Sequence, residues 1–340
     1  MLTIFGQFLQ PGRRGSVDIF FGNLLKGFSA IGAEVVVEPS ASTRFGGRFM
    51  AEQSDILGLG PGPVLLPDYF TPPIIPKGVR TVAVIHDLRF RRFPWSMPAS
   101  KVAWLNAAVP LTLARADRVI VTSDFTKSEL MDCYPTLTRR CDIRVIPEPL
   151  DMTRFVSDAP TPYNPLAPSV LCPVSGAGHE NLKFFFRLFE QRRELAEFKL
   201  VVVGAKPVEI PWPRSTSGRY GDRMRFINIA QFGVVPDEFL GVLHRQADVV
   251  IFPSVYEGFG RPIFEALSLG APVVCTSTGA VREMGDVPAL IVQDPNDEDE
   301  WVEAILKQRR VRRPGWQALP QFPELDPATV AARYLDACTF

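Results

Sequence analysis

The chain has 340 residues, of which 46% are hydrophobic and 22% are charged, and its 37 Lys and Arg balance 37 Asp and Glu. A formal charge of zero argues against a nucleic-acid-binding protein, because such proteins derive affinity from a basic surplus. Five scattered cysteines without a Cys-x-x-Cys pair indicate free thiols in a reducing compartment, and three histidines are too few for a His-rich metal centre. At this length, two domains of about 150 residues each are expected.

The first residues and the hydropathy along the chain predict a cytoplasmic protein. Met1–Gln7 runs directly into a strand-like segment and lacks the basic start and apolar core of a signal peptide. The sequence has no apolar run of about eighteen residues, the length at which a membrane-spanning helix becomes a candidate. Peripheral attachment to the cytoplasmic membrane face stays open.

Short β-branched runs alternate with longer helical patterns in residues 1–156. The expected strands are Leu2–Phe5, Ala33–Val37, Thr81–Ile85, Arg118–Thr122 and Ile143–Ile146, and the expected helices are Ser16–Ile31, Lys101–Ala114 and Thr126–Cys133. This alternation is typical of a parallel sheet with helices on both faces. It predicts a first, doubly wound α/β domain.

A proline-rich segment, SDAPTPYNPLAP at residues 157–168, predicts a linker, and the alternation then restarts. The expected strands are Ser169–Pro173, Lys199–Val203, Arg225–Ile229, Val249–Pro253, Pro272–Cys275 and Ala289–Val292, and the expected helices are Asn181–Glu194, Pro236–Gln246, Pro262–Leu269 and Asp297–Arg309. Residues 169–312 are thus a second α/β domain. Residues 313–340, which end in a helix at Asp326–Cys338, are expected to pack back on the first.

Two tandem domains of this kind place the carboxyl ends of their strands at a shared cleft, where ligands bind. One post-strand segment fits that role, PSVYEGFGRPIFEAL, which follows the apolar run Val249–Phe252. Glycines let backbone amides approach a ligand, and a helix beginning near Pro262 offers N–H groups to phosphate. Carboxylates of Glu257 and Glu265 could accept hydrogen bonds from vicinal hydroxyls, which suits a sugar nucleotide. The alternative is a turn with two solvated glutamates.

The segment resembles the signature of a large family of retaining glycosyltransferases with the GT-B fold, which includes bacterial mannosyl-, glucosyl- and rhamnosyltransferases. The family pattern P-S-x-x-E-G-F-G-x-P-x-x-E-A-x-x-x-G-x-P-V fits PSVYEGFGRPIFEALSLGAPVV throughout. The resemblance implies that Glu257 and the amides of Gly258, Phe259 and Gly260 hold the hydroxyls of the donor sugar. It implies that Glu265 binds the ribose.

His86 and Asp87 end the apolar run Val82–Ile85, and the bare pattern favours a histidine satisfied at a strand end. The same stretch is similar to the family's strand followed by His-Asp-Leu. That resemblance implies a catalytic histidine at His86, which acts with Glu257, and a contact of Asp87 with the acceptor or sugar.

Two further loops carry predicted contacts. Gly12–Gly15 follows the first strand and is either a solvated basic turn or, by the resemblance, a phosphate loop with Gly15 at the donor. Arg13 and Arg14 are then candidates for an anionic acceptor or a diphosphate. The stretch Gln231–Glu238 resembles the loop whose main chain reads the nucleobase, here at Gly233 and Val234.

The loop after Ser169–Pro173 departs from the family. Its members have a cationic pair before Asn-Leu, and this chain has His179 and Glu180 there. A carboxylate beside a diphosphate is repulsive, so Lys183, Arg261 or the Arg13/Arg14 loop would have to supply the charge. Alternatively, donor handling is atypical or activity is weak. Ser175 and the glycines after it could still form a phosphate-binding loop.

The stretch Leu88–Trp95 interleaves basic and aromatic residues. It suits contact with the inner membrane surface or a lipid-linked acceptor, and a solvated loop with packed aromatic rings is equally consistent with it.

By its resemblance, the protein is a retaining hexosyltransferase of polysaccharide biosynthesis. It would move a hexose from a nucleoside diphosphate sugar, first GDP-mannose, to a saccharide or lipid-linked saccharide, with no metal or cofactor. The alternatives are a silent sugar-nucleotide-binding scaffold and an epimerase of the same fold. No nucleic-acid partner is expected.

Overall fold

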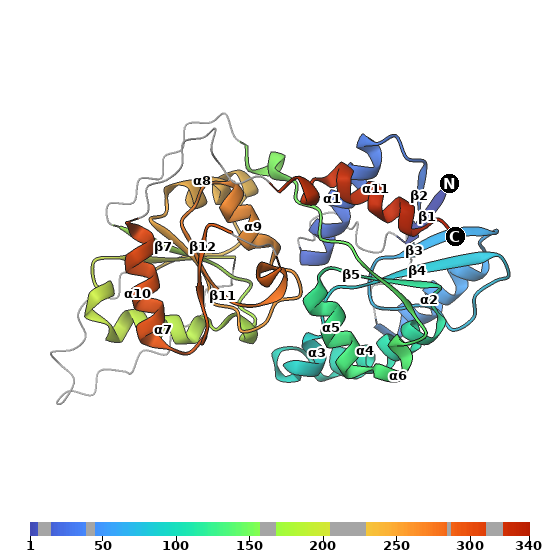
Figure 1. Ribbon diagram of the computed structural model, residues 1–340, viewed down its shortest axis with the longest axis horizontal. Coiled ribbons are helices and arrows are strands. Elements are labelled where there is room, and N and C mark those ends of the chain that lie inside the picture. Colours follow the sequence, from blue (N-terminus) through green and yellow to red (C-terminus); the bar gives the residue numbers. More distant parts are fainter. Residues whose placement is uncertain (6–14, 39–44, 157–167, 205–228, 284–286, 311–321) are drawn as a thin grey trace. The chain divides into compact units, whose positions relative to one another are not determined.

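The computed structural model describes residues 1–5, 15–38, 45–156, 168–204, 229–283, 287–310 and 322–340 (Figure 1). The chain forms two compact units. The first comprises Met1–Asp151, Glu257–Phe259 and Phe322–Phe340, and the second comprises Met152–Tyr256 and Gly260–Gln321. The linker predicted at residues 157–168 lies outside the described residues except for Pro168.

The first unit contains a six-stranded parallel sheet with the strand order β2-β1-β3-β4-β5-β6. Its strands are β1 (Leu2–Phe5), β2 (Val35–Glu38), β3 (Gly62–Leu66), β4 (Val79–Ile85), β5 (Arg118–Val121) and β6 (Asp142–Val145). Its helices are α1 (Ser16–Ala30), α2 (Phe45–Leu57), α3 (Arg89–Arg92), α4 (Ala99–Arg115), α5 (Asp124–Cys133), α6 (Pro135–Thr138) and, from the chain's end, α11 (Pro327–Ala337). Short 3-10 turns lie at Pro94–Ser96 and Pro323–Leu325.

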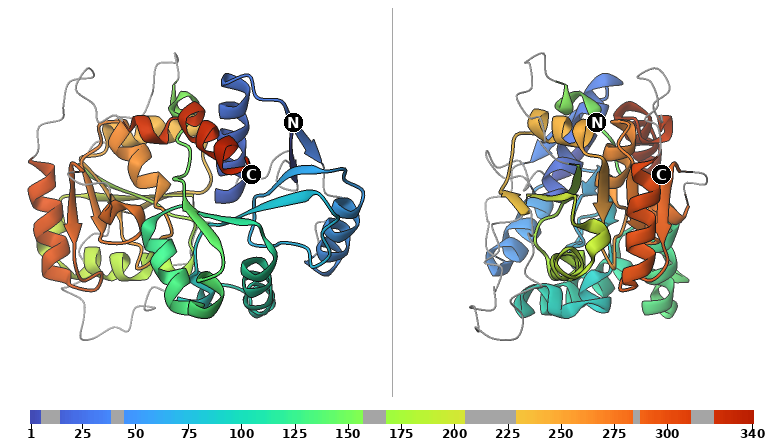
Figure 2. Two further views of the ribbon diagram at one scale, coloured as in Figure 1. Left: turned by 45° about the vertical axis from the view of Figure 1, so that its right-hand side comes forward. Right: turned by 90° about the vertical axis from the view of Figure 1, so that its left-hand side faces the viewer.

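Helices cover both faces of this sheet, as the alternation along β4 shows (Figure 2). Val82 and Val84 are buried with residues of α1 and α11, whereas Ile85 is buried with residues of α4 and α5. Successive side chains of a strand point to opposite faces, so a nearly continuous apolar strand requires a helical layer on each side.

The second unit repeats the plan with the order β12-β11-β10-β7-β8-β9, again all parallel. Its strands are β7 (Ser169–Pro173), β8 (Lys199–Val203), β9 (Ile229–Phe232), β10 (Val249–Phe252), β11 (Val273–Thr276) and β12 (Ala289–Val292). Its helices are α7 (Leu182–Gln191), α8 (Asp237–Gln246), α9 (Arg261–Ser268) and α10 (Glu298–Arg309), with 3-10 turns at Met152–Phe155 (η2), Gly178–Glu180 (η3), Arg193–Leu195 and Gly279–Arg282.

Aromatic residues dominate the core of the second unit. The stretch Phe184–Phe186 of α7 is buried, and the ring of Phe185 stands edge-on to Trp301 of α10 with centroids 4.7 Å apart. The indole N–H of Trp301 donates to the Pro295 carbonyl at 3.1 Å, which satisfies its polar edge.

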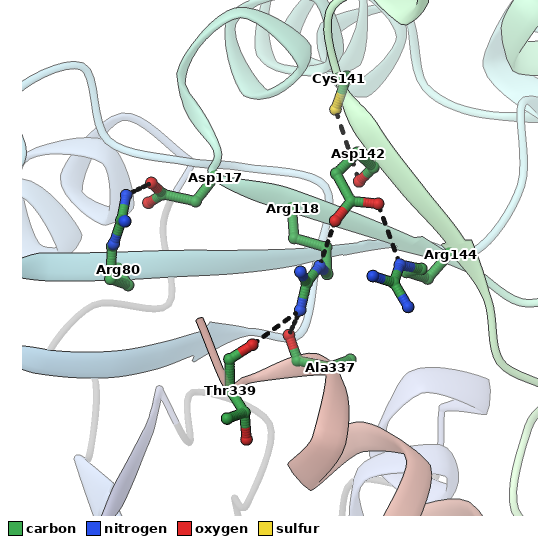
Figure 3. Close-up of polar contacts among 8 residues, drawn as sticks. All are labelled: Arg80, Asp117, Arg118, Cys141, Asp142, Arg144, Ala337 and Thr339. Carbon is green, nitrogen blue, oxygen red and sulfur yellow. Dashed lines mark hydrogen bonds and ion pairs between the residues drawn. The ribbon is translucent and has the colours of Figure 1, made fainter.

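The C-terminal residues are fixed to the first unit. Arg118 at the start of β5 donates from Nη1 to the Ala337 carbonyl and, at 3.3 Å, to the Thr339 carbonyl, while its Nε pairs with Asp142 at 2.6 Å (Figure 3). Its guanidinium also lies 4.9 Å from the centroid of the Phe340 ring. These contacts hold the last residues beyond α11 against the sheet.

The prediction of two doubly wound α/β domains is confirmed, with two local corrections. The sequence pattern missed α2 and β3, and the latter contains Gly62 and Pro63, which disfavour a strand assignment. Of the strand expected at Arg225–Ile229, residues 225–228 lie outside the described residues, and the described strand β9 runs over Ile229–Phe232. Among the described helices, none is both long and apolar enough to cross a membrane.

Candidate active site

The strand order of the second unit defines where a ligand would bind. β7 and β10 are neighbours, and the chain winds outward from them in opposite directions. The carboxyl ends of two such strands form the crevice in which doubly wound sheets bind ligands. The loop after β7 and the loop after β10 both begin there, and the Val255 N–H donates to the His179 carbonyl at 2.8 Å. The two predicted donor loops are therefore joined by a backbone hydrogen bond.

The loop after β10 leads into α9 through a backbone conformation that only glycine adopts readily. Gly260 precedes the helix with φ +89°, in the left-handed region. Pro262 follows at the first turn, where its missing N–H leaves no intrahelical bond unmade. Glu265 then lies on α9 with only 4% of its surface exposed.

The Glu265 carboxylate is held by two arginines. Its Oε1 accepts from Arg154 Nη2 at 2.6 Å and from Arg261 Nε at 3.2 Å. Arg154 belongs to η2, and its other terminal nitrogen, Nη1, lies 3.3 Å from Asp237 Oδ2 at the start of α8. Arg261 was predicted as a possible source of positive charge for a diphosphate. It is only 4% exposed, and its Nε donates to Glu265.

His244 on α8 is buried near this group and carries no charge at neutral pH. Burial, together with the positive charges of Arg154 and Arg245, lowers its pKa to about 3. His244 therefore adds no positive charge to the group around Glu265.

In the loop after β7, the carboxylate of Glu180 accepts hydrogen bonds from the loop's own backbone amides. Its Oε1 accepts from the Ser175 N–H at 2.8 Å and its Oε2 from the Ala177 N–H at 2.6 Å, and the Ser175 hydroxyl lies within 3.0 Å of both oxygens. A phosphate would use the same kind of donors. The loop thus already holds an anion, and this anion is part of the chain.

The remaining predicted donor residues of this unit lie on α7 and directly after β9. Lys183 is exposed on the first turn of α7. Gly233 and Val234 follow β9 directly, so Gln231 and Phe232, which the sequence analysis placed in the same loop, are instead its last strand residues. The Gly233 carbonyl accepts from the Gly204 N–H at 2.9 Å, and Val234 is 74% exposed.

In the first unit, His86 directly follows β4, and its ring is buried and has polar partners at both nitrogens. Its Nε2 lies 2.9 Å from the Pro67 carbonyl, and its Nδ1 lies 3.7 Å from Glu148 Oε1, an ion-pair distance. The Phe20 ring stands edge-on to it with centroids 4.8 Å apart. These are the contacts of a histidine satisfied at a strand end, and its contact with a donor sugar stays a prediction.

The other predicted residues of the first unit are more exposed. Asp87 is half-buried, and its Oδ1 accepts from the Arg89 N–H at 3.0 Å. Gly15 caps α1 and donates its N–H to Asp18 Oδ2 at 2.8 Å. Arg13 and Arg14 lie outside the described residues.

The basic and aromatic stretch before α4 is largely packed. Phe90 is buried, Arg92 pairs with Glu129 at 2.5 Å and Arg91 donates to Asn106 at 2.9 Å, whereas Trp95 is 67% exposed. Membrane contact through this stretch stays a prediction.

Comparison with known proteins places this geometry in a family. A family model described as Glycosyltransferase Family 4 matches residues 40–154, and one described as Glycosyl transferases group 1 matches residues 168–308. The chain belongs to the group 1, family 4 type of glycosyltransferases. The resemblance stated from the signature segment is thereby confirmed.

Relatives and solved structures agree with this family. The chain is 27% identical over 265 residues to the O-antigen chain mannosyltransferase B of Escherichia coli, a match that covers 71% of this chain and 63% of that protein. The matched part therefore spans less than two thirds of the relative's length. The GT-B fold is shown by solved structures. WaaG, a glycosyltransferase involved in lipopolysaccharide biosynthesis, has a TM-score of 0.64 at 16% identity and covers 99% of this chain and 95% of its own. HepE of Anabaena, solved with UDP-glucose, has a TM-score of 0.62 at 14% identity and covers 99% and 94%.

Two polar residues of this glycosyltransferase chain were missed by the sequence analysis. Arg154 gave no signal, since it lies in an irregular segment 111 residues before its partner Glu265. Glu148 was not among the predicted site residues either, and the structure places its carboxylate beside the His86 ring.

The pKa of His86 gives a first prediction. Burial lowers it, but the Glu148 carboxylate, the Pro67 carbonyl and Asp68 together raise it above the ordinary 6.5. The charged ring therefore contributes stability that is complete below 6.5 and is lost as the pH rises through the raised value. Glu148→Gln removes the main raising group, so the pKa of His86 should fall and this pH-dependent stability should disappear.

NMR titration of the imidazole signals measures this directly, because the chain has only three histidines. Chemical denaturation of both proteins at pH 5.5 and pH 8.5 gives the linked stability. A Glu148→Gln protein whose His86 titrates at the wild-type pH contradicts the assignment.

Glu180 gives a second prediction. Glu180→Ala removes the acceptor of the Ser175 and Ala177 amides, so the free energy of unfolding should fall by about 1–2 kcal/mol. The same change frees N–H groups and removes a like charge, so the affinity for GDP should rise severalfold. Denaturation and calorimetric titration with GDP measure the two effects. Glu190→Ala, an exposed glutamate on α7, is the control. GDP affinity that is unchanged by Glu180→Ala would show that a diphosphate does not approach this loop.

Proposed function

We propose that this chain is a retaining hexosyltransferase that moves a hexose, with GDP-mannose as the first donor to test, to a saccharide or lipid-linked saccharide acceptor. The observation that carries the proposal is the placement of the signature segment. Its loop follows β10 at the point where the strand order of the second sheet reverses, and its helix holds Glu265 at that edge. The name of the Escherichia coli relative supports mannose and a role in cell-surface polysaccharide synthesis.

In the proposed reaction, Glu257 and the amides of Gly258 to Gly260 bind the hexose hydroxyls, and Glu265 binds the ribose. His86 contacts the donor sugar. The acceptor oxygen bonds to the anomeric carbon on the same face of the sugar from which the diphosphate departs, and the departing diphosphate accepts the proton of the acceptor hydroxyl. Catalysis then rests on positioning and on stabilising charge as it develops on the diphosphate.

The proposed reaction uses no metal and no cofactor. Among the described residues, no group of three or more His, Cys, Asp or Glu side chains is arranged to hold a metal ion. Peripheral contact with the inner membrane surface, through the exposed Trp95, is a further part of it.

A second candidate function is a scaffold that binds a sugar nucleotide without transferring the sugar. Glu180 favours it, because a carboxylate fills the loop in which the family places cations. Donor binding without transfer to any acceptor is its expected behaviour.

The deciding experiment is a thermal-shift screen with GDP-mannose, UDP-glucose and a dTDP-sugar, followed by transfer to lipid-linked and free oligosaccharides. We expect one nucleotide class to stabilise the protein, and NMR of the product should show the donor's anomeric configuration. An inverted product contradicts retention, binding without transfer supports the scaffold, and no stabilisation by any nucleotide contradicts the donor site.

A further inference from the structure

We propose that Arg154 is the positioning residue that fixes the Glu265 carboxylate for the donor ribose, and that it thereby sets the preference for ribonucleotides over 2′-deoxyribonucleotides. The inference rests on the proposed function and deepens it, because it names what holds the ribose-reading group. It assigns a role to the short segment Met152–Phe155, which belongs to no part of the signature.

The contacts of Glu265 divide its two oxygens into different roles. Arg154 Nη2 and Arg261 Nε both donate to Oε1, at 2.6 and 3.2 Å. Among the described residues none donates to Oε2, and this atom is not among the fully enclosed polar atoms without a partner. One oxygen is thus fixed by the protein, and the other remains an acceptor for a ligand hydroxyl.

Arg154 is itself held at several points. Its side chain is 13% exposed, its Nη1 lies 3.3 Å from Asp237 Oδ2, and its guanidinium lies 4.3 Å from the centroid of the Phe155 ring. Phe155 is fully buried. A planar guanidinium fixed by a carboxylate and a ring presents its remaining terminal N–H groups in one direction, which a flexible ammonium cannot do.

The backbone next to Arg154 is seated against α8 by a glycine. A Cβ at Gly241 would lie 2.8 Å from the Phe155 carbonyl oxygen and 3.0 Å from its Cβ, so a side chain there would displace η2. Arg245 Nη1 also donates to the Phe155 carbonyl at 3.4 Å. The position of Arg154 is therefore determined by packing as well as by charge.

The charges around Glu265 argue for a positioning role rather than one in stability. Arg154 lies between Glu265 and Asp237, Arg261 adds a second positive charge at Glu265, and His244 is neutral beside Arg154. A buried ion pair of this kind contributes little net stability, because desolvation offsets the attraction. Its clearest effect is to keep one carboxylate in one orientation.

The test compares the affinity for GDP with that for 2′-deoxy-GDP, and for UDP with that for 2′-deoxy-UDP, by calorimetry on the full chain. The wild type should prefer the ribonucleotide of the pair that it binds, because a group built to hydrogen-bond a hydroxyl disfavours the analogue that lacks it. Arg154→Met should weaken ribonucleotide binding about tenfold and bring the ribo-to-deoxy ratio close to one. Arg154→Lys should restore part of the preference.

A mutant cycle separates positioning from packing. If Arg154 acts through Glu265, Arg154→Met in a Glu265→Gln background should change ribonucleotide affinity by less than about twofold. Arg187→Met, which removes an exposed arginine of α7, is the matched control and should leave affinity and ratio unchanged. Gly241→Ala keeps every charge and displaces η2, so it should lower the ratio as well.

The outcomes are distinct. A wild type that binds none of the four nucleotides overturns the proposed function and this inference together. A wild type that discriminates, with an Arg154→Met protein that keeps the same ratio, overturns the inference alone. If Arg154→Met does not fold, Arg154→Lys and Gly241→Ala decide, and an unchanged ratio in both overturns the inference.

Discussion

Gly27→Ala is expected to destabilise the first unit by about 3 kcal/mol, at the upper end of ordinary overpacking. A Cβ on Gly27 of α1 would lie 2.0 Å from the Pro327 carbonyl oxygen, 2.6 Å from its carbon and 2.9 Å from the Cβ of Ala331. Two of these atoms are backbone atoms of α11, so no rotamer change relieves the contact. The first unit then has to separate α1 from α11, whose Val330 and Tyr334 are fully buried in the same core.

Gly22→Ala in the same helix is the matched control. Nothing lies within 4 Å of a Cβ at Gly22, so the change should stabilise the protein by about 0.5–1 kcal/mol through helix propensity alone. Denaturant unfolding of both variants measures the difference. If the two substitutions have equal effects, α11 does not pack on α1 at Gly27.

Local sequence patterns predicted most of the fold because the informative strands are buried on both faces. Runs such as Lys199–Val203 and Val249–Phe252 are nearly all apolar, and the structure has strands over both. β3 escaped because Gly62 and Pro63 open it, and its identity as a strand depends on pairing with β1 and β4 on either side. The residues of a strand do not by themselves determine which strands it pairs with.

The site could be predicted only where the residues that form it are close in sequence. The signature segment places a glycine turn, a proline and Glu265 within one loop and one helix, so its local geometry could be predicted from the residue types alone. The partner of Glu265 could not be found in this way, because Arg154 reaches it from 111 residues away. Glu180 was expected to repel a phosphate at its loop, and the structure adds that it binds the loop's own amides.

Glu257→Ala is expected to lower the rate of sugar transfer by about 10²–10³-fold, the range found when one group that stabilises a transition state is removed. Glu257 lies half-buried in the loop between β10 and α9, where Ser254, Tyr256 and Phe259 are buried. The measurement is the initial rate of transfer from GDP-mannose, or from whichever donor stabilises the wild type, with kcat and KM determined separately. Glu303→Ala, an exposed glutamate on α10, should have no effect on either.

The two glutamates of the signature should differ in a second measurement. If Glu257 reads the hexose and Glu265 the ribose, Glu257→Ala should bind GDP, which carries no hexose, as tightly as the wild type. Glu265→Gln should bind GDP more weakly, and its affinity for the intact donor should fall by a similar factor, because both ligands contain the same ribose. Equal losses of GDP affinity in both variants would indicate that both carboxylates contact the nucleotide and that neither binds the hexose. The comparison therefore tests the assignment of each carboxylate separately, whereas loss of transfer activity alone would follow from damage at either end of the donor.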